Sequence, residues 1–187
     1  MSDVIERHHK ACAGFTRVLG AAAGLDIWDA PSPCTEWDAR GVVEHVIGFQ
    51  ERLLLTPLGV DAHRPRDDPR ARWRATAHAI FTAVGRDGAL DTVVDVPGMG
   101  QSPVHRLLPT LTTDVLVHTW DLGRALGIDD ELDEELCALA YERSLPFDEA
   151  LRSSGMFGPK VAVSDDADIQ TKLIAFFGRD PNWKAPD

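Results

Sequence analysis

The strongest constraint on the fold lies in residues 111–126, where a helical pattern carries ionisable groups on its apolar side. At about 100° per residue, one narrow stripe of this helix holds Leu107, Leu111, Asp114, His118, Asp121 and Ala125. A soluble helix normally turns such a stripe toward the core, where an unpaired carboxylate or imidazole is costly. These groups therefore need partners. The pattern leaves two interpretations open, a satisfied polar network and a metal site.

The remaining periodicity predicts further amphipathic helices. We expect helices over residues 3–24, 36–55, 68–85, 103–127, 130–153 and 165–178. The predicted start signals are Ser2, Thr35 with Asp38, Ser102 followed by Pro103, and the pair Asp165 and Asp166. Leu145 and Phe147 are expected on the apolar side of the helix over 130–153, which Pro146 interrupts. Residues 90–97 predict a short strand or extended segment, so the expected class is mainly all-α.

Size and charge argue against several classes of protein. The 187 residues suffice for one well-cored domain with a small C-terminal addition. A net charge of −11 argues against a nucleic-acid binder and against an anionic membrane surface as partner. We expect neither a signal peptide nor a transmembrane helix, which would need roughly 20 apolar residues in a row. The three cysteines form no Cys-x-x-Cys pair, which favours a reducing cytoplasm over a disulfide framework.

A further ligand-type side chain lies on the predicted helix over 36–55. His45 belongs to its apolar surface, with Gly41 one turn before it and Gly48 one turn after it. Each glycine costs a helix about 1 kcal/mol, so the pair indicates either space reserved beside the imidazole or close helix packing. His8 lies in the apolar stripe of the first helix and is a candidate fourth ligand. A core histidine bonded to a backbone carbonyl is the simpler interpretation of His8.

Together, His45, Asp114 and His118 would supply two imidazoles and one carboxylate. A set of three ligands leaves a coordination position open for water or substrate, as catalytic zinc sites require. These donors suit zinc, nickel or iron(II) and disfavour calcium and magnesium, which prefer oxygen ligands. The spacing does not establish that the two helices meet.

Three stretches carry a resemblance to a known family: PSPCTEWDARGVVEHVIG (31–48), DVLVHTWDLGRALG (114–127) and MFGPKVAVSDDADIQTKLIAFFGRDPNW (156–183). Together they resemble the metal-binding DinB/YfiT-like superfamily, and more narrowly its branch related to mycothiol-dependent maleylpyruvate isomerase. The closing GRDPNW is similar to a subgroup of uncharacterised metal-binding proteins. The resemblance implies a four-helix bundle with a divalent metal at one end of its core, here residues 1–128. Residues 129–187 would form a C-terminal helical extension packed on the bundle.

By this resemblance the metal ligands are His45, Asp114 and His118. The isomerase usually has glutamate where this chain has Asp114, which is one methylene shorter and would hold the metal differently. Trp120 and Asp121 match a tryptophan–aspartate pair of the family. We expect Asp121 either to orient a ligand or to cap a helix terminus, and it is the first alternative ligand.

The resemblance also implies a function. In this branch a divalent metal, here zinc or nickel, activates a low-molecular-weight thiol such as mycothiol. The thiolate then attacks a small electrophile in a transfer or isomerisation reaction. The expected partners are a small-molecule thiol and the electrophile, and the resemblance also allows a homodimer. Two alternatives stay open: a non-catalytic module that binds metal or a small molecule, and a metal-dependent hydrolase.

Three further side chains have weaker claims to a role, and no general base is identifiable. Cys34 lies just before a helix N-terminus, a position that can lower the pKa of a thiol, but a small buried apolar residue is the simpler interpretation. Arg52 and Arg124 could hold a carboxylate of the thiol or substrate, although ordinary surface arginines explain both more simply.

Overall fold

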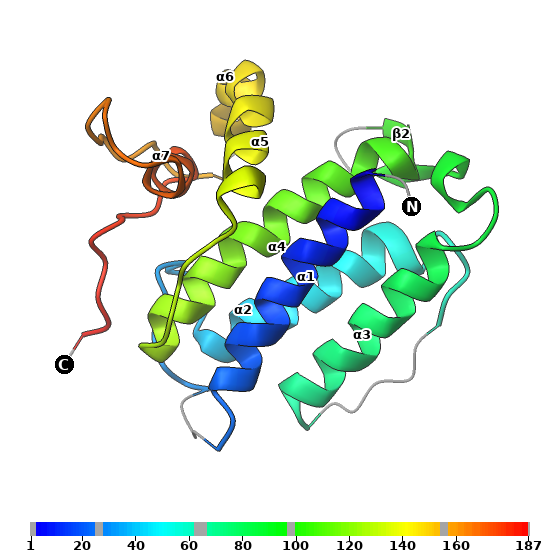
Figure 1. Ribbon diagram of the computed structural model, residues 1–187, viewed down its shortest axis with the longest axis horizontal. Coiled ribbons are helices and arrows are strands. Elements are labelled where there is room, and N and C mark those ends of the chain that lie inside the picture. Colours follow the sequence, from blue (N-terminus) through cyan, green and yellow to red (C-terminus); the bar gives the residue numbers. More distant parts are fainter. Residues whose placement is uncertain (1–2, 25–27, 62–66, 97–99, 154–156, 187) are drawn as a thin grey trace.

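The computed structural model describes residues 3–24, 28–61, 67–96, 100–153 and 157–186. Four long helices dominate it: α1 (Asp3–Ala21), α2 (Ala39–Gln50), α3 (Pro69–Val84) and α4 (Val104–Leu126). α4 packs against α1 and α2, and α3 packs against both of them on the other side (Figure 1). The mainly all-α class with a four-helix bundle, predicted from the sequence, is confirmed.

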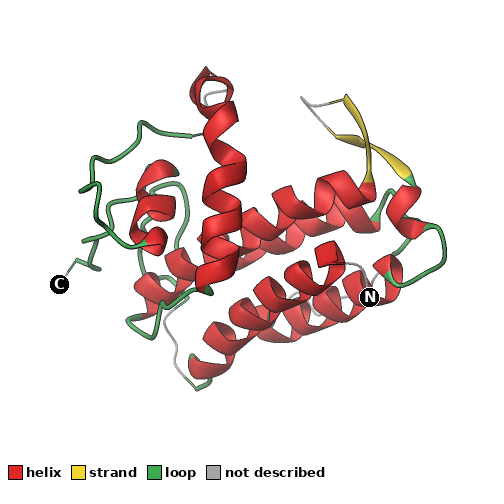
Figure 2. Cartoon of the chain, turned by 45° about the horizontal axis from the view of Figure 1, so that its top comes forward, coloured by secondary structure: helices red, strands yellow, loops and turns green. Residues whose placement is uncertain are grey.

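Shorter elements flank this bundle (Figure 2). A π-helical turn, η1 (Glu51–Leu55), continues α2, and a 3₁₀ turn, η2 (Ala89–Asp91), leads into an antiparallel pair of strands, β1 (Val93–Val96) and β2 (Gly100–Pro103). The C-terminal part holds α5 (Glu134–Ser144), η3 (Leu145–Phe147), α6 (Asp148–Ser153) and α7 (Ile169–Phe176). α5 packs against α4 and against α7. None of the described helices is long and apolar enough to cross a membrane.

Two helices begin later than predicted because an aspartate further along the chain than the predicted cap residue caps each of them. α2 starts after Asp38, whose side chain accepts a hydrogen bond from the backbone N–H of Gly41 at 2.7 Å, and Thr35 lies in the preceding turn. α7 starts after Asp168, which caps it in the same way, whereas Asp165 and Asp166 lie upstream of the helix. An aspartate stabilises a helix only where its side chain reaches an unpaired backbone N–H.

The predicted start of α4 is also wrong, although its position is nearly right. Ser102 belongs to strand β2 and not to a helix cap, and Pro103 precedes the first helical residue. The short extended segment predicted over residues 90–97 is confirmed by β1, whereas its partner strand β2 was not predicted. Strand β2 is short and polar, so it has no apolar alternation that would have indicated it.

The predicted helix over 130–153 is three separate pieces. α5 begins after Asp133, which caps it through the backbone N–H of Leu136, and the chain tightens into a 3₁₀ turn at Pro146. Leu145 is 46% exposed and Phe147 is 58% exposed, so the expectation that they face the core is wrong. Proline has no backbone N–H to donate to the hydrogen bond that an α-helix needs there, so the regular helix ends. In the 3₁₀ turn that follows, the side chains of Leu145 and Phe147 are exposed to solvent.

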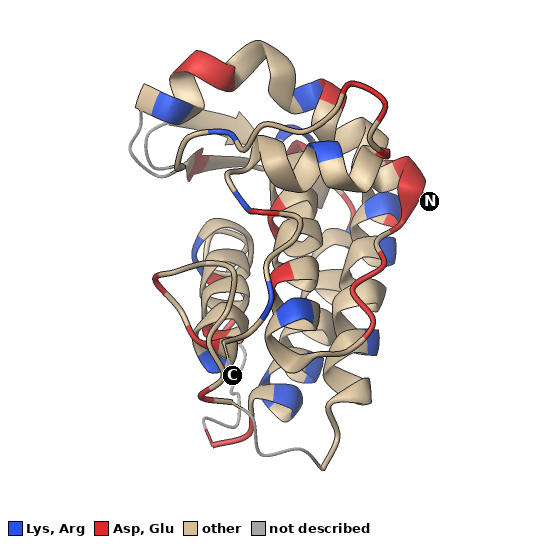
Figure 3. Ribbon diagram, turned by 90° about the vertical axis from the view of Figure 1, so that its left-hand side faces the viewer, with Lys and Arg blue, Asp and Glu red and all other residues tan. Residues whose placement is uncertain are grey.

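One apolar core joins the bundle to the C-terminal helices. Phe15 of α1 meets Trp73 of α3 edge to face, with ring centroids 4.7 Å apart. Both are fully buried, and the same cluster of buried side chains includes Leu136 of α5 and Leu173 of α7. The predicted division of the chain after residue 128 stays a prediction. Basic and acidic residues are interspersed along the ribbon in the view of Figure 3.

His8 lies in this interior and not among the candidate ligands. It is fully buried on α1, with Nδ1 3.1 Å from the Thr112 hydroxyl and Nε2 3.7 Å from the Cys12 sulfur. The cluster of potential metal ligands found among the described residues does not include it. Its side-chain partners also differ from the backbone carbonyl expected for a core histidine.

The burial of His8 predicts a loss of stability in mild acid. Burial lowers the pKa of His8 from 6.5 to about 4, although the nearby Gln50 amide and Asp114 carboxylate act in the opposite direction. Between these two pH values the unfolded chain binds a proton at His8 that the folded chain does not bind. Above pH 6.5 His8 is neutral in both states and does not reduce the stability of the folded chain. As the pH drops toward 4, we expect the free energy of unfolding to fall by up to about 3 kcal/mol.

Denaturant unfolding of the parent and of His8→Gln at pH 7 and pH 4.5 measures this effect. The variant should lose clearly less stability between the two pH values than the parent does. An equal loss in both proteins would assign the acid sensitivity to other groups.

Candidate metal centre

Helices α2 and α4 pack together inside the bundle and bring three predicted ligands into one place. His45 lies on α2, and Asp114 and His118 lie one turn apart on α4. One potential ligand atom from each residue lies within 4.8 Å of the other two. His45 Nε2 is 3.2 Å from Asp114 Oδ1, and His118 Nε2 is 3.6 Å from the same oxygen. Residues on two helices that are about 70 positions apart in the chain therefore share one site.

Aromatic rings hold His45 in place. The indole of Trp37 stacks on the His45 imidazole, with centroids 4.1 Å apart and ring planes 23° apart, and Phe49 stacks at 5.6 Å. A Cβ at Gly41 would lie 2.8 Å from the Cβ of Trp37, so the glycine allows Trp37 to approach the helix. A Cβ at Gly48 would meet nothing within 4 Å, and the structure gives no reason for that glycine. The space next to His45 is thus occupied by Trp37.

Asp121 orients His118 from behind. Its Oδ2 lies 2.8 Å from His118 Nδ1, so the opposite ring nitrogen, Nε2, faces Asp114. Arg179 binds the same carboxylate twice, with Nη2 2.8 Å from Oδ2 and Nε 3.2 Å from Oδ1. Of the two roles predicted for Asp121, these contacts match the orientation of a ligand, because no backbone N–H at a helix start is involved.

The charge of Arg179 keeps Asp121 ionised despite complete burial. Burial by itself would raise the pKa of Asp121, but the Arg179 guanidinium and the His118 hydrogen bond together hold it below its ordinary value. The same pairing raises the pKa of Arg179, against the effect of its own burial. A buried pair with two parallel hydrogen bonds fixes the geometry of both partners.

Asp114 provides the test of whether these residues fit a metal ion. Its Oδ2 is buried and has no hydrogen-bond partner among the described residues. Leaving a charged acceptor buried and unpaired costs a protein about 1–3 kcal/mol or more. A divalent cation held by this carboxylate and two imidazole nitrogens would remove that cost, and these donors suit zinc or nickel. The residues present therefore fit a divalent metal.

Asp114→Asn is expected to lower metal affinity about 10-fold, or about 1.4 kcal/mol. The amide retains an oxygen donor but loses the negative charge that favours a dication. Competition with a chromophoric chelator measures the change. If the variant binds metal as tightly as the parent, the third ligand lies elsewhere, and Asp121 is the first alternative.

The other candidates from the sequence lie outside this cluster of ligand atoms. Cys34 is half-buried near Arg179 and Asp121, and burial raises the pKa of its thiol, which disfavours a nucleophilic role. Arg124 pairs with Asp130 and its guanidinium lies 5.1 Å from the ring of Trp120. Arg52 lies 5.6 Å from the ring of Phe49.

Sequence reasoning missed two residues of the site. Trp37 was not assigned to the site from the sequence, and its stacking on His45 connects it to the centre. Arg179 was not singled out, although it belongs to the GRDPNW stretch (178–183) that supported the resemblance.

Comparisons with known proteins show the family of the chain. The family model described as the mycothiol maleylpyruvate isomerase N-terminal domain matches residues 8–123. Two relatives, each described as an uncharacterized protein, come from two strains of Mycobacterium tuberculosis. Each is 32% identical over 184 residues, covering 95% of this chain and 98% of the relative. No solved structure gives a significant match.

Proposed function

This chain belongs to the family of the mycothiol maleylpyruvate isomerase N-terminal domain, and on that premise we propose that it is a divalent-metal-dependent enzyme that uses a thiol. The thiol would be of low molecular weight and of the mycothiol type, and the reaction would be transfer to, or isomerisation of, a small electrophile. One observation carries the proposal. Asp114 presents a buried, unpaired carboxylate oxygen beside the two imidazoles of His45 and His118.

Each residue would have a defined task in this centre. His118 donates Nδ1–H to Asp121, which leaves the lone pair of Nε2 directed at the site. His45 is held between Trp37 and Phe49, whose rings also make its surroundings apolar. Asp114 would neutralise part of the charge of the metal. When bound, a divalent metal lowers the pKa of a thiol and so makes the nucleophilic thiolate available at neutral pH.

The proposal is tested by metal and thiol dependence measured together. Untagged protein is purified without chelators, its zinc, nickel, iron, cobalt and manganese are quantified, and consumption of maleylpyruvate and of other small electrophiles is followed with and without mycothiol. The proposal predicts turnover that needs both the metal and the thiol, and that is absent in His118→Ala. Turnover without any thiol would favour a hydrolase, and tight binding of metal or thiol without turnover would favour a binding module. Either result would overturn the proposed reaction.

A further inference from the structure

We propose that Arg179 is a positioning residue for His118, acting through Asp121. The C-terminal segment, residues 178–183, is thereby part of the metal centre. Arg179 lies outside the residues that match the family model, which end at position 123. The inference rests on the proposed function in one respect, since it takes His118 to be a metal ligand.

The geometry of Arg179 leaves it little freedom. Two of its nitrogens bind the two oxygens of Asp121, at 2.8 and 3.2 Å, and Nη1 donates to the backbone carbonyl of Phe177 at 2.9 Å. Its side chain is only 12% exposed, and that of Asp121 is fully buried. The guanidinium is therefore fixed by its own backbone on one side and by the carboxylate on the other. A guanidinium held at both edges fixes the plane of the carboxylate that it binds.

The plane of the Asp121 carboxylate in turn fixes the His118 ring. Asp121 Oδ2 accepts the Nδ1 hydrogen of His118 at 2.8 Å, and this bond selects the tautomer with a free lone pair on Nε2. Without Arg179, the remaining described partner of this buried carboxylate would be His118 alone. The carboxylate could then rotate, and the imidazole would lose its fixed orientation. Partners that orient a metal-binding histidine typically contribute about 10–100-fold to metal affinity.

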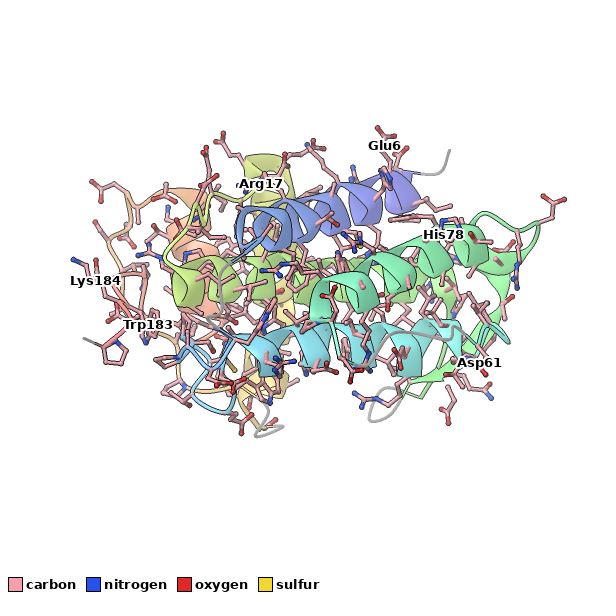
Figure 4. The ribbon with its side chains drawn as sticks, turned by 90° about the horizontal axis from the view of Figure 1, so that it is seen from below. Glu6, Arg17, Asp61, His78, Trp183 and Lys184 are labelled. Carbon is pink, nitrogen blue, oxygen red and sulfur yellow. The ribbon has the colours of Figure 1, made fainter. Side chains whose placement is uncertain are left out.

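The local sequence explains how Arg179 reaches α4. Gly178 follows α7 with a φ of +81°, a backbone conformation that residues with a side chain rarely adopt. A Cβ added at this position would lie 3.1 Å from the carbonyl oxygen of Pro159. The backbone N–H of Arg179 bonds to the carbonyl of Ile174 in α7 at 3.1 Å, which holds the turn, and the side chain of Arg179 reaches Asp121 on α4. Further along, Arg124 of α4 lies 3.4 Å from the carbonyl of Trp183. Trp183 and Lys184 lie at one end of the bundle, opposite His78 (Figure 4). The segment thus contacts α4 at two points, one of which is the carboxylate behind His118.

Arg152 supplies a matched control for a purely structural role. It donates to the backbone carbonyls of Gly158 and Phe176 and pairs with Asp148, so it holds the same C-terminal region without touching Asp121. Arg152→Gln and Arg179→Gln should both lower the melting temperature. Only Arg179→Gln should disturb the metal centre.

Two measurements on the full chain test the proposal, with circular dichroism to establish that each variant is folded. In chelator competition with zinc, we expect Arg179→Gln to bind about 10–100-fold more weakly than the parent, and Arg179→Lys to lie between them because a charge is retained. Arg152→Gln should remain within about 3-fold of the parent, since it leaves Asp121 untouched. Equal losses in Arg152→Gln and Arg179→Gln, or none in either, would overturn the proposal.

The second measurement needs no metal and so separates this inference from the proposed function. Nitrogen-15 NMR of the metal-free protein reports which ring nitrogen of His118 carries the hydrogen. We expect the Nδ1–H tautomer in the parent and in Arg152→Gln, and a mixture of tautomers in Arg179→Gln. A His118 spectrum that is unchanged in Arg179→Gln would overturn the inference even if the parent binds metal. A parent that binds no metal would instead overturn the proposed function.

Discussion

His118→Ala is expected to lower metal affinity by roughly 100-fold or more while leaving the helical content essentially unchanged. Loss of a ligand should cost more than loss of a group that only orients one, which is about 10–100-fold. The fold should persist because the apolar stripes of the bundle, and not the polar site, carry most of its stability. Chelator competition measures the affinity, and far-ultraviolet circular dichroism measures the helix content.

His78→Ala is the matched control, because His78 is exposed on α3 (Figure 4) and is not part of the cluster of candidate ligands. It should bind metal as the parent does. If His118→Ala is unfolded, or if the parent unfolds when metal is removed, the metal has a structural role. If His118→Ala binds metal as tightly as the parent, His118 is not a ligand.

Trp73→Ala is expected to have the opposite profile, with a large loss of stability and little change in metal affinity. Trp73 is fully buried, packs edge to face on Phe15, and donates its indole N–H to Thr16 at 2.8 Å. Truncating a buried tryptophan leaves a cavity and typically lowers the free energy of unfolding by about 3–5 kcal/mol. Denaturant unfolding of the metal-free protein measures the loss.

Thr16→Val separates the hydrogen bond of Trp73 from its packing. This variant should lose only about 1–2 kcal/mol, because the indole remains in place. Two hydrogen bonds are removed, the one that the Trp73 indole donates to Thr16 and the one that the Thr16 hydroxyl donates to the carbonyl of Cys12. Metal affinity should stay within a few-fold of the parent in both variants, under conditions where each is folded. A loss of metal binding in folded Trp73→Ala would show that the core and the site are coupled.

The sequence predicted the individual helices because their signal is local. Helical periodicity repeats along each of α1 to α4, and His118 follows Asp114 by one turn of the same helix, so their shared face is fixed by the geometry of the helix. His45 could be placed on an apolar face, but its contact with α4 depends on packing between elements that are distant in the chain. The resemblance to a known family, and not the periodicity, supplied that pairing.

Helix ends and the partners of Asp121 were less predictable. Several aspartates precede α2 and α7, and only the folded backbone decides which of them reaches an unpaired N–H. Arg179 is 58 residues from Asp121 in the chain. The turn at Gly178 that directs it toward α4 has no periodic sequence pattern from which it could be predicted. A buried carboxylate demands a partner, so the sequence indicated that one exists without indicating which residue it is.

Location of the metal itself tests the central claim most directly. Crystals of protein reconstituted with zinc, measured on both sides of the zinc absorption edge, give an anomalous difference map. We predict a single strong peak, from a zinc ion bound by His45 Nε2, His118 Nε2 and a carboxylate oxygen of Asp114, with Asp121 still paired to Arg179. The account would be contradicted by a zinc ion bound to Asp121, by a peak away from these residues, or by no peak after reconstitution.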